Sequence, residues 1–144
     1  MLRIDPMTSD ADVAAARALL EEFYTPPSGA FFLAREEDQP AGCIGLRDLG
    51  GGVCEMKRLY VRDAFRGRGI GRRLAGHLAG EARRMGFSRM RLDSLAWMKE
   101  AHALYRSMGF RGIPAYHDRG QPGEIFMELD LAVPASRPAS ASPA

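Results

Sequence analysis

The run "RGRGIGRRL", residues 66–74, decides how this sequence folds, because it places glycines at positions 67, 69 and 71 among four arginines. Glycine at alternate positions removes the Cβ clash that would keep successive backbone N–H groups from turning inward toward one point. The apolar stripe of a predicted helix begins near Ile70, so the unpaired N–H groups and the positive dipole end of that helix lie at the same place. The run therefore predicts a loop that holds phosphate.

Two better-known phosphate loops are excluded by their spacing. The P-loop pattern needs Lys and then Ser or Thr after its second glycine, and the sequence contains no such triplet. The dinucleotide pattern G-x-G-x-x-G, started at Gly67, would need a glycine where Arg72 stands. What remains is R-x-x-G-x-G, from Arg66 to Gly71.

The elements around this loop predict an α/β (α+β) chain. The expected strands cover residues 2–4, 30–34, 41–46, 53–61, 89–92 and 125–131, and the expected helices carry apolar stripes over 13–23, 70–85 and 98–108. The parallel step runs from strand 53–61 through helix 70–85 to strand 89–92. Ligands of such units gather at the carboxyl ends of the strands and at the N-terminus of the crossover helix, which is where the loop lies.

Two glycines, Gly76 and Gly80, interrupt the helix predicted over 70–85. Each costs about 1 kcal/mol against alanine in a helix interior. We expect close packing of another backbone or of a ligand to compensate for that cost.

Composition predicts one soluble domain with a tail. The chain has 144 residues, of which 46% are apolar and 26% charged, as in ordinary globular domains. We expect a single domain over residues 1–131. Residues 132–144 are almost wholly Pro, Ala and Ser, a composition that cannot form a core, so a disordered tail is predicted there.

The charge pattern points to a local anion site. The net charge of +2 is too small for bulk affinity for nucleic acid, but Lys57 to Arg73 holds seven basic residues and one acid, Asp63. No apolar run reaches the roughly 20 residues of a membrane span, and the acidic N-terminus does not resemble a signal peptide. The expected compartment is the cytoplasm, with no membrane partner.

The cysteines and histidines predict neither a disulfide nor a metal site. A turn centred on Gly50 and Gly51 would place Arg47, and not Cys43, opposite Cys54, so two buried free thiols are expected. The three histidines lack metal-ligand spacing, and no metal or other chemical role is predicted for them (His77, His102, His117).

Two stretches of the chain resemble the GNAT superfamily of N-acetyltransferases. One is "MKRLYVRDAFRGRGIGRRLAGHLAGEARRMGF", residues 56–87, which contains that family's (Q/R)-x-x-G-x-(G/A) motif for the pyrophosphate of acetyl-coenzyme A. The other is "ALYRSMGF", residues 103–110, with a Tyr a few residues before Gly-Phe. The resemblance implies a GNAT-type mixed, mostly antiparallel central sheet flanked by helices, with a β-α-β core that binds acetyl-coenzyme A.

The resemblance also implies roles for individual residues. Tyr105 takes the position of the general acid that protonates the leaving thiolate; the alternative is a core tyrosine. Glu55 is our candidate for the base or its water relay, with Asp93 in reserve, and the alternative for Glu55 is a simple ion pair on a strand. The implied coenzyme-binding residues are Leu59, Tyr60, Val61, Arg66, Gly67, Arg68, Gly69, Ile70, Gly71 and Arg72.

Two departures from the family pattern affect the expected site. Met98 stands where many members have an Asn that contacts the coenzyme arm, so that contact is lost or replaced. Members usually have two helices between the first and second strands, and Thr25 to Gly29 is too short for the second one. We expect a shortened first-helix region, with an acceptor side that is more open or completed by another subunit.

These observations predict an acetyl-coenzyme A-dependent N-acetyltransferase, an acyltransferase acting on a small-molecule or peptide amine that the sequence does not identify. The loop from Tyr116 to Gly123 is expected to border the acceptor, and a homodimer is one option that the family implies. The alternative is an acetyl-coenzyme A sensor or an inactive module of the same fold. Nucleic-acid binding is disfavoured because the arginines are interleaved with glycines and not with aromatic residues.

Overall fold

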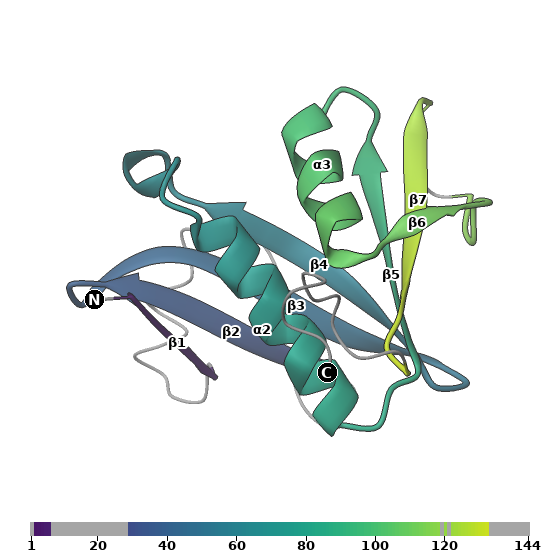
Figure 1. The fold of residues 1–144 in the computed structure, drawn as a ribbon, viewed down its shortest axis with the longest axis horizontal. Helices are drawn as coiled ribbons and strands as arrows, with labels where there is room; N and C mark the ends of the chain where they lie inside the picture. Colours follow the sequence, from purple (N-terminus) through teal and green to yellow (C-terminus); the bar gives the residue numbers. More distant parts are fainter. Residues whose placement is uncertain (1, 7–28, 119, 121, 133–144) are drawn as a thin grey trace, which may run out of the picture.

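The computed structural model describes residues 2–6, 29–118, 120 and 122–132, and within them seven strands form one mixed sheet (Figure 1). The strands are β1 (Leu2–Pro6), β2 (Gly29–Glu36), β3 (Gln39–Gly50), β4 (Val53–Val61), β5 (Arg89–Leu95), β6 (Arg111–Ile113) and β7 (Glu124–Asp130). Their order is β1-β2-β3-β4-β5-β7-β6. Only β4 and β5 are parallel among these paired strands, so the predicted mixed, mostly antiparallel sheet is confirmed.

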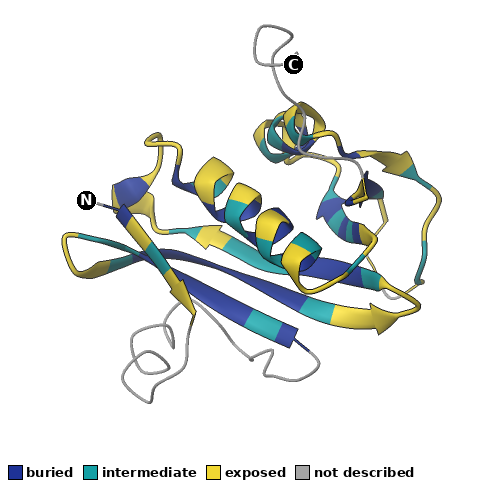
Figure 2. Ribbon diagram, turned by 60° about the horizontal axis from the view of Figure 1, so that its bottom comes forward, coloured by how far each residue is buried: buried dark blue, intermediate teal, exposed yellow. Residues whose placement is uncertain are grey.

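Helix α2 (Ile70–Arg84) crosses one face of the sheet over β2, β3 and β4 (Figure 1). Its buried side faces the strands and its exposed side faces solvent, as Figure 2 shows. The buried residues include Ile70, Leu74, Leu78 and Ala82, which the apolar stripe predicted. The last residue of that stripe, Met85, is 43% exposed, because the helix ends at Arg84 and Met85 caps it.

The two glycines inside α2 do not mark a close approach. Gly76 and Gly80 lie on the exposed side of the helix, and a Cβ added at either would meet nothing within 4 Å. The expectation that another backbone packs against them is wrong, because these positions of the helix face away from the sheet. The alternative, a ligand packed there, stays a prediction.

The turn between β3 and β4 sets the register that builds the site. Three successive glycines have positive φ, and Gly51 and Gly52, with φ of 65° and 82°, form the two-residue turn. Gly50 therefore pairs with Val53 inside the ladder, the register shifts between Asp48 and Gly50, and Asp48, not Arg47, lies opposite Cys54. The predicted register is wrong by one residue.

This register places Arg47 of β3 directly opposite Glu55 of β4.

The expectation of buried free thiols is confirmed, because Cys43 and Cys54 are both buried and are not bonded to each other.

Strands β4 and β5 pair over a short distance and then separate. Their parallel register joins Val53 to Glu55 with Arg89 to Arg91 and goes no further, and the strands diverge beyond it (Figure 1). In the diverging half, the β3 and β4 register shifts near Cys43, and Arg58 of β4 has a φ of 61°. An irregularity of this kind bends a strand, and here it accompanies the opening between β4 and β5.

Helix α3 (Lys99–Met108) follows β5, and the short strand β6 pairs with β7. Strand β5 reaches Leu95, beyond the predicted end at residue 92, and β6 was not predicted. The helix predicted over 13–23, the connection expected before Ala30 and the tail from 133 lie outside the described residues. Among the residues that are described, no helix is long and apolar enough to cross a membrane.

Candidate active site

The glycine-rich loop leads from the end of β4 to the N-terminus of α2. Gly67 and Gly69 have φ of 80° and 78°, in the left-handed region, and Gly69 is the N-cap of α2. The side chain of Arg66 fastens the loop to the strand, since its Nε donates to the Val61 carbonyl oxygen at 3.0 Å and Nη1 lies 3.3 Å from Asp63 Oδ1. Because residues with a Cβ rarely adopt positive φ, the loop conformation depends on Gly67 and Gly69.

A cavity of about 640 Å³ lies between this loop and the start of α3. Six of the predicted coenzyme-binding residues line it: Val61, Arg66, Gly67, Gly69, Ile70 and Gly71. From the opposite side, Trp97, Met98 and Lys99 contribute to the wall. We call this space the coenzyme cavity.

Four of the predicted coenzyme-binding residues lie elsewhere. Leu59 lines the second cavity described below, and Tyr60 is exposed. The guanidinium of Arg68 lies over the Phe65 ring at 5.3 Å. Arg72 instead reaches α3, where its Nη1 donates to Ser107 Oγ at 2.9 Å.

A second cavity, of about 530 Å³, occupies the opening between β4 and β5, and we call it the reaction cavity. Its charged lining residues are Arg47, Lys57, Arg58, Asp93 and Glu124, and its other lining residues include Leu59 and Tyr105. Met98 lines both cavities, so the two lie next to each other at this residue. At the position where the family pattern has an amide, the Met98 sulfur accepts a weak contact from Ser94 Oγ at 3.8 Å.

Tyr105 projects from α3 into the wall of the reaction cavity. Only 7% of the residue is exposed, and its ring packs against Phe110 with centroids 5.6 Å apart. Burial raises the pKa of Tyr105 to about 12, because the charged phenolate is poorly solvated there. The hydroxyl therefore keeps its proton near neutral pH.

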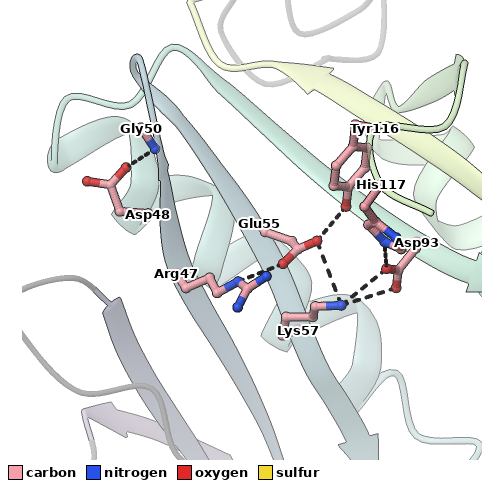
Figure 3. Close-up of polar contacts among 8 residues, drawn as sticks. All are labelled: Arg47, Asp48, Gly50, Glu55, Lys57, Asp93, Tyr116 and His117. Atoms are coloured by element: carbon pink, nitrogen blue, oxygen red, sulfur yellow. Dashed lines mark hydrogen bonds and ion pairs between the residues drawn. The ribbon is translucent and has the colours of Figure 1, made fainter. Parts of the chain in front are cut away.

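Glu55 lies behind the reaction cavity in a network of donors (Figure 3). Its side chain is fully buried, Oε1 accepts from Arg47 Nε at 2.9 Å, and Oε2 accepts from the Tyr116 hydroxyl at 2.6 Å. The Lys57 ammonium lies 3.7 Å from Oε2. Both carboxylate oxygens are thus engaged, and Glu55 does not line the cavity.

Asp93 is the carboxylate that does line the reaction cavity. Lys57 Nζ donates to its two oxygens at 3.1 and 3.4 Å, and His117 Nε2 lies 2.6 Å from Oδ2 (Figure 3). Burial alone would raise the pKa of Asp93, but the hydrogen bond from His117 and the charge and hydrogen bond of Lys57 outweigh it and hold that pKa below its ordinary value.

His117 is the site residue that sequence reasoning missed. The histidines were set aside because their spacing along the chain lacks a metal-ligand pattern. The loop after β6 instead folds Tyr116 onto Glu55 and His117 onto Asp93. The only indication in the sequence that His117 could lie near the site was the expectation that its loop, residues 116–123, borders the acceptor.

Glu55, Asp93 and His117 bring potential ligand atoms within 4.8 Å of one another. The donor set does not fit a metal centre, because the Lys57 ammonium lies 3.1 Å from Asp93 Oδ2 and 3.7 Å from Glu55 Oε2. That ammonium supplies the positive charge that a cation would bring. We therefore assign no metal to these three residues.

Solved structures with this fold define the class of protein. The chain superposes on a Klebsiella pneumoniae protein assigned as an acyl-CoA N-acyltransferase with a TM-score of 0.78 and 27% identity, covering 91% of this chain and 98% of the other. It also superposes on a Bacillus subtilis acetyltransferase solved in complex with CoA, with a TM-score of 0.68 and 18% identity, covering 90% and 99% of the two chains. The fold is that of acyltransferases.

Sequence comparison gives the family. The profile of the Acetyltransferase (GNAT) family matches residues 3–110. The chain is 38% identical to an uncharacterized N-acetyltransferase of Schizosaccharomyces pombe over 111 residues, which is 76% of this chain and 68% of the relative. It is 34% identical to YjgM, an uncharacterized N-acetyltransferase of Escherichia coli, over 131 residues, or 87% and 77% of the two chains. The chain belongs to the GNAT family of acetyltransferases, and the predicted resemblance is confirmed.

Proposed function

We propose that this enzyme transfers the acetyl group of acetyl-coenzyme A directly to a primary amine. The observation that carries the proposal is that Met98 lines both the coenzyme cavity under the glycine-rich loop and the reaction cavity lined by Tyr105, so the two cavities are adjacent. A phosphate-binding loop next to a proton donor suits a thioester whose coenzyme lies in one cavity and whose acetyl group reaches the other.

The coenzyme is held mainly by backbone groups in this proposal. The N–H groups around Gly67 to Gly71 and the N-terminus of α2 bind the pyrophosphate, and Arg66 adds charge. The backbone of Leu59, Tyr60 and Val61 contacts the pantetheine arm, with the Val61 amide near the thioester oxygen. The lining of the coenzyme cavity and the left-handed Gly67 and Gly69 support this role.

Tyr105 acts as the general acid. Its raised pKa, about 12, keeps the hydroxyl protonated at neutral pH, so it can donate to the coenzyme A thiolate as the carbon–sulfur bond breaks. Its place in the wall of the reaction cavity, which is adjacent to the coenzyme cavity, supports the assignment.

Asp93 receives the proton of the acceptor ammonium, directly or through water. An amine attacks only in its neutral form, so a proton acceptor must lie in the reaction cavity. Both carboxylates are hydrogen-bonded, but Asp93 lines that cavity, whereas the Glu55 side chain is fully buried and does not. The prediction that Glu55 is the base stays a prediction, and the geometry supports Asp93 ahead of it.

The acceptor is a polar amine whose identity stays open. The chain is 33% identical to an IAA acetyltransferase of Azospirillum brasilense over 131 residues, covering 89% of this chain and 86% of the relative. It is 31% identical to the N-acetylaspartate synthetase of Rattus norvegicus over 115 residues, covering 78% and 38%. These names give unlike acceptors. The charged lining of the reaction cavity supports a polar one, bordered in our proposal by the loop from Tyr116 to Gly123.

The test combines binding with turnover. Calorimetric titration with acetyl-coenzyme A measures the dissociation constant, and thiol release across a panel of amines measures transfer. Cys43 and Cys54 add little background to the thiol assay, because burial raises the pKa of each to about 12. Coenzyme binding with turnover of at least one amine is the expected result. Binding without turnover of any amine would favour a sensor, and absence of binding would contradict the coenzyme site.

A further inference from the structure

Lys57 is a primary amine fixed inside the reaction cavity. The sequence contains only two lysines, Lys57 and Lys99, among its 20 lysine and arginine residues. Lys57 lines the cavity together with Tyr105 and Asp93, and its side chain is 23% exposed. Figure 3 shows its ammonium directed toward Asp93 and Glu55, with Nζ 3.1 Å from Asp93 Oδ2.

Among the three cationic side chains that line the reaction cavity, only this one can be acetylated. Arginine stays protonated in proteins, so Arg47 and Arg58 offer no neutral nitrogen to a thioester. A lysine becomes a nucleophile once it loses a proton. Asp93 Oδ2, at 3.1 Å, is placed to receive that proton.

We propose that Lys57 is an internal acetyl acceptor, so that the enzyme acetylates its own reaction cavity when no external amine occupies it. The inference rests on the proposed acetyl-coenzyme A reaction. The proton leaves Nζ for Asp93 and then water, a bond forms between Nζ and the acetyl carbon, and the carbon–sulfur bond breaks. Tyr105 supplies the proton to the leaving sulfur, and the second proton that the acetylated nitrogen loses passes through water and restores the Tyr105 hydroxyl. The products are acetyl-lysine, free coenzyme A and one proton released to water.

The ion pairs of Lys57 make this reaction slower than transfer to a good acceptor. Asp93 and Glu55 both favour the charged ammonium, and only the small neutral fraction attacks. An external amine that occupies the cavity also competes for the thioester. Self-acetylation therefore proceeds when acetyl-coenzyme A is abundant and the acceptor is scarce.

Acetylation of Lys57 would switch the site off. It removes the positive charge that now lies between the carboxylates of Asp93 and Glu55. It also leaves an uncharged amide in the volume that the external amine must enter. The acceptor side thus becomes inactive, while the coenzyme cavity, whose lining does not include Lys57, keeps its structure.

Mass spectrometry of the wild-type protein tests the proposal without knowledge of the natural acceptor. The protein is incubated with acetyl-coenzyme A alone, digested, and the peptides that contain Lys57 and Lys99 are followed over time. Lys99 is the internal control, because it is exposed and lines the coenzyme cavity. We expect Lys57 to gain one acetyl group about tenfold faster or more, because it lines the cavity that receives the acetyl group in the proposed reaction. The rate constant should not depend on protein concentration, and Tyr105→Phe should slow the reaction.

Loss of activity gives a second readout. Preincubation with acetyl-coenzyme A should progressively inactivate the wild type and a Lys99→Arg variant, whereas Lys57→Arg, which keeps the charge, should lose none of its starting activity with time. Equal labelling of the two lysines would mean that the reaction cavity gives Lys57 no advantage and would overturn the proposal. An unmodified Lys57 in an enzyme that acetylates an external amine would overturn the proposal and leave the function intact. Failure to bind acetyl-coenzyme A would overturn both.

Discussion

The two cavities that meet at Met98 are built in different ways. The coenzyme cavity draws on one continuous run of chain, residues 66–71, whose glycines set the backbone. The reaction cavity collects charged side chains from β3, β4, β5 and the start of β7. Residues of the loop after β6 pair with Asp93, which lines the cavity, and with Glu55, which does not. Backbone conformation determines the first site and a network of ionised side chains the second, so the two should respond to different substitutions.

Tyr105→Phe should have the largest effect of any single change. Loss of the proton donor should lower kcat about 100-fold, because general acid catalysis contributes on that scale. The dissociation constant for acetyl-coenzyme A should stay the same, because the hydroxyl lies in the reaction cavity. Thiol release and calorimetry on the same preparation measure the two quantities.

Tyr116→Phe is the matched comparison, since it removes a hydroxyl that donates to Glu55. It should lower stability more than it lowers kcat. Equal loss of kcat in the two phenylalanine variants would contradict the role of Tyr105.

Asp93→Asn and Glu55→Gln separate the two carboxylates. Asp93→Asn should lower kcat by about tenfold or more with little change in coenzyme affinity, because it removes the proton acceptor in the cavity. Glu55→Gln should act on stability, at about 2 kcal/mol, because it leaves Arg47 and Lys57 without their buried partner. Urea unfolding and steady-state kinetics provide the measurements.

The reverse outcome would change the assignment of the base. If Glu55→Gln lost as much kcat as Asp93→Asn at unchanged stability, Glu55 would be the proton acceptor, as the sequence predicted.

Gly69→Ala should damage the coenzyme cavity and spare the reaction cavity. Its φ of 78° lies in the left-handed region, which costs other residues about 1–2 kcal/mol. Relief of that strain would shift the loop, so affinity for acetyl-coenzyme A should fall by about tenfold. At saturating coenzyme, kcat should recover. A large fall in kcat at saturation would mean that the two cavities are not independent.

Acid should weaken the reaction-cavity network. The pKa of Asp93 is lower in the folded protein than in the unfolded chain, so its contribution to stability is complete above about pH 4 and is lost as pH falls through the folded value. The Asp93→Asn variant should lose less stability than the wild type between about pH 5 and pH 2. Parallel curves for the two proteins, from denaturant unfolding at each pH, would contradict the depressed pKa.

The smallest effect should come from Gly80→Ala on the exposed side of α2. Nothing lies within 4 Å of the added Cβ, so the gain in helix propensity, about 0.5–1 kcal/mol, should appear in full as stability. Coenzyme affinity and kcat should not change, which makes this variant a control for the others. A change in either would indicate that α2 transmits strain to the loop.

The same contrast between the two cavities explains which features could be predicted from the sequence and which could not. Strand β4, the start of α2 at Ile70 and the place of the glycine-rich loop between them were predicted correctly, because alternation, helical period and glycine conformation are local properties. The position of Met85 was misjudged, since the apolar stripe continued past the true end of the helix.

The reaction cavity depended on information that is not local. The pairing of Arg47 with Glu55 follows from a turn that lies one residue later than expected together with the register shift between Asp48 and Gly50. The contacts of Tyr116 and His117 follow from the path of a loop across two strands. Neither leaves a periodic or compositional pattern in the sequence, so the candidate carboxylates could be named and their partners could not.

Trp97 gives this enzyme an optical property of its own. It is the single tryptophan of the chain, it is 72% exposed, and it lies in the wall of the coenzyme cavity next to Met98. Indole emission shifts to shorter wavelength when water around the ring is displaced, so a coenzyme that enters this cavity should change the fluorescence of the unlabelled protein. Arrival of the coenzyme could then be timed by stopped flow, separately from the chemistry that follows in the neighbouring cavity.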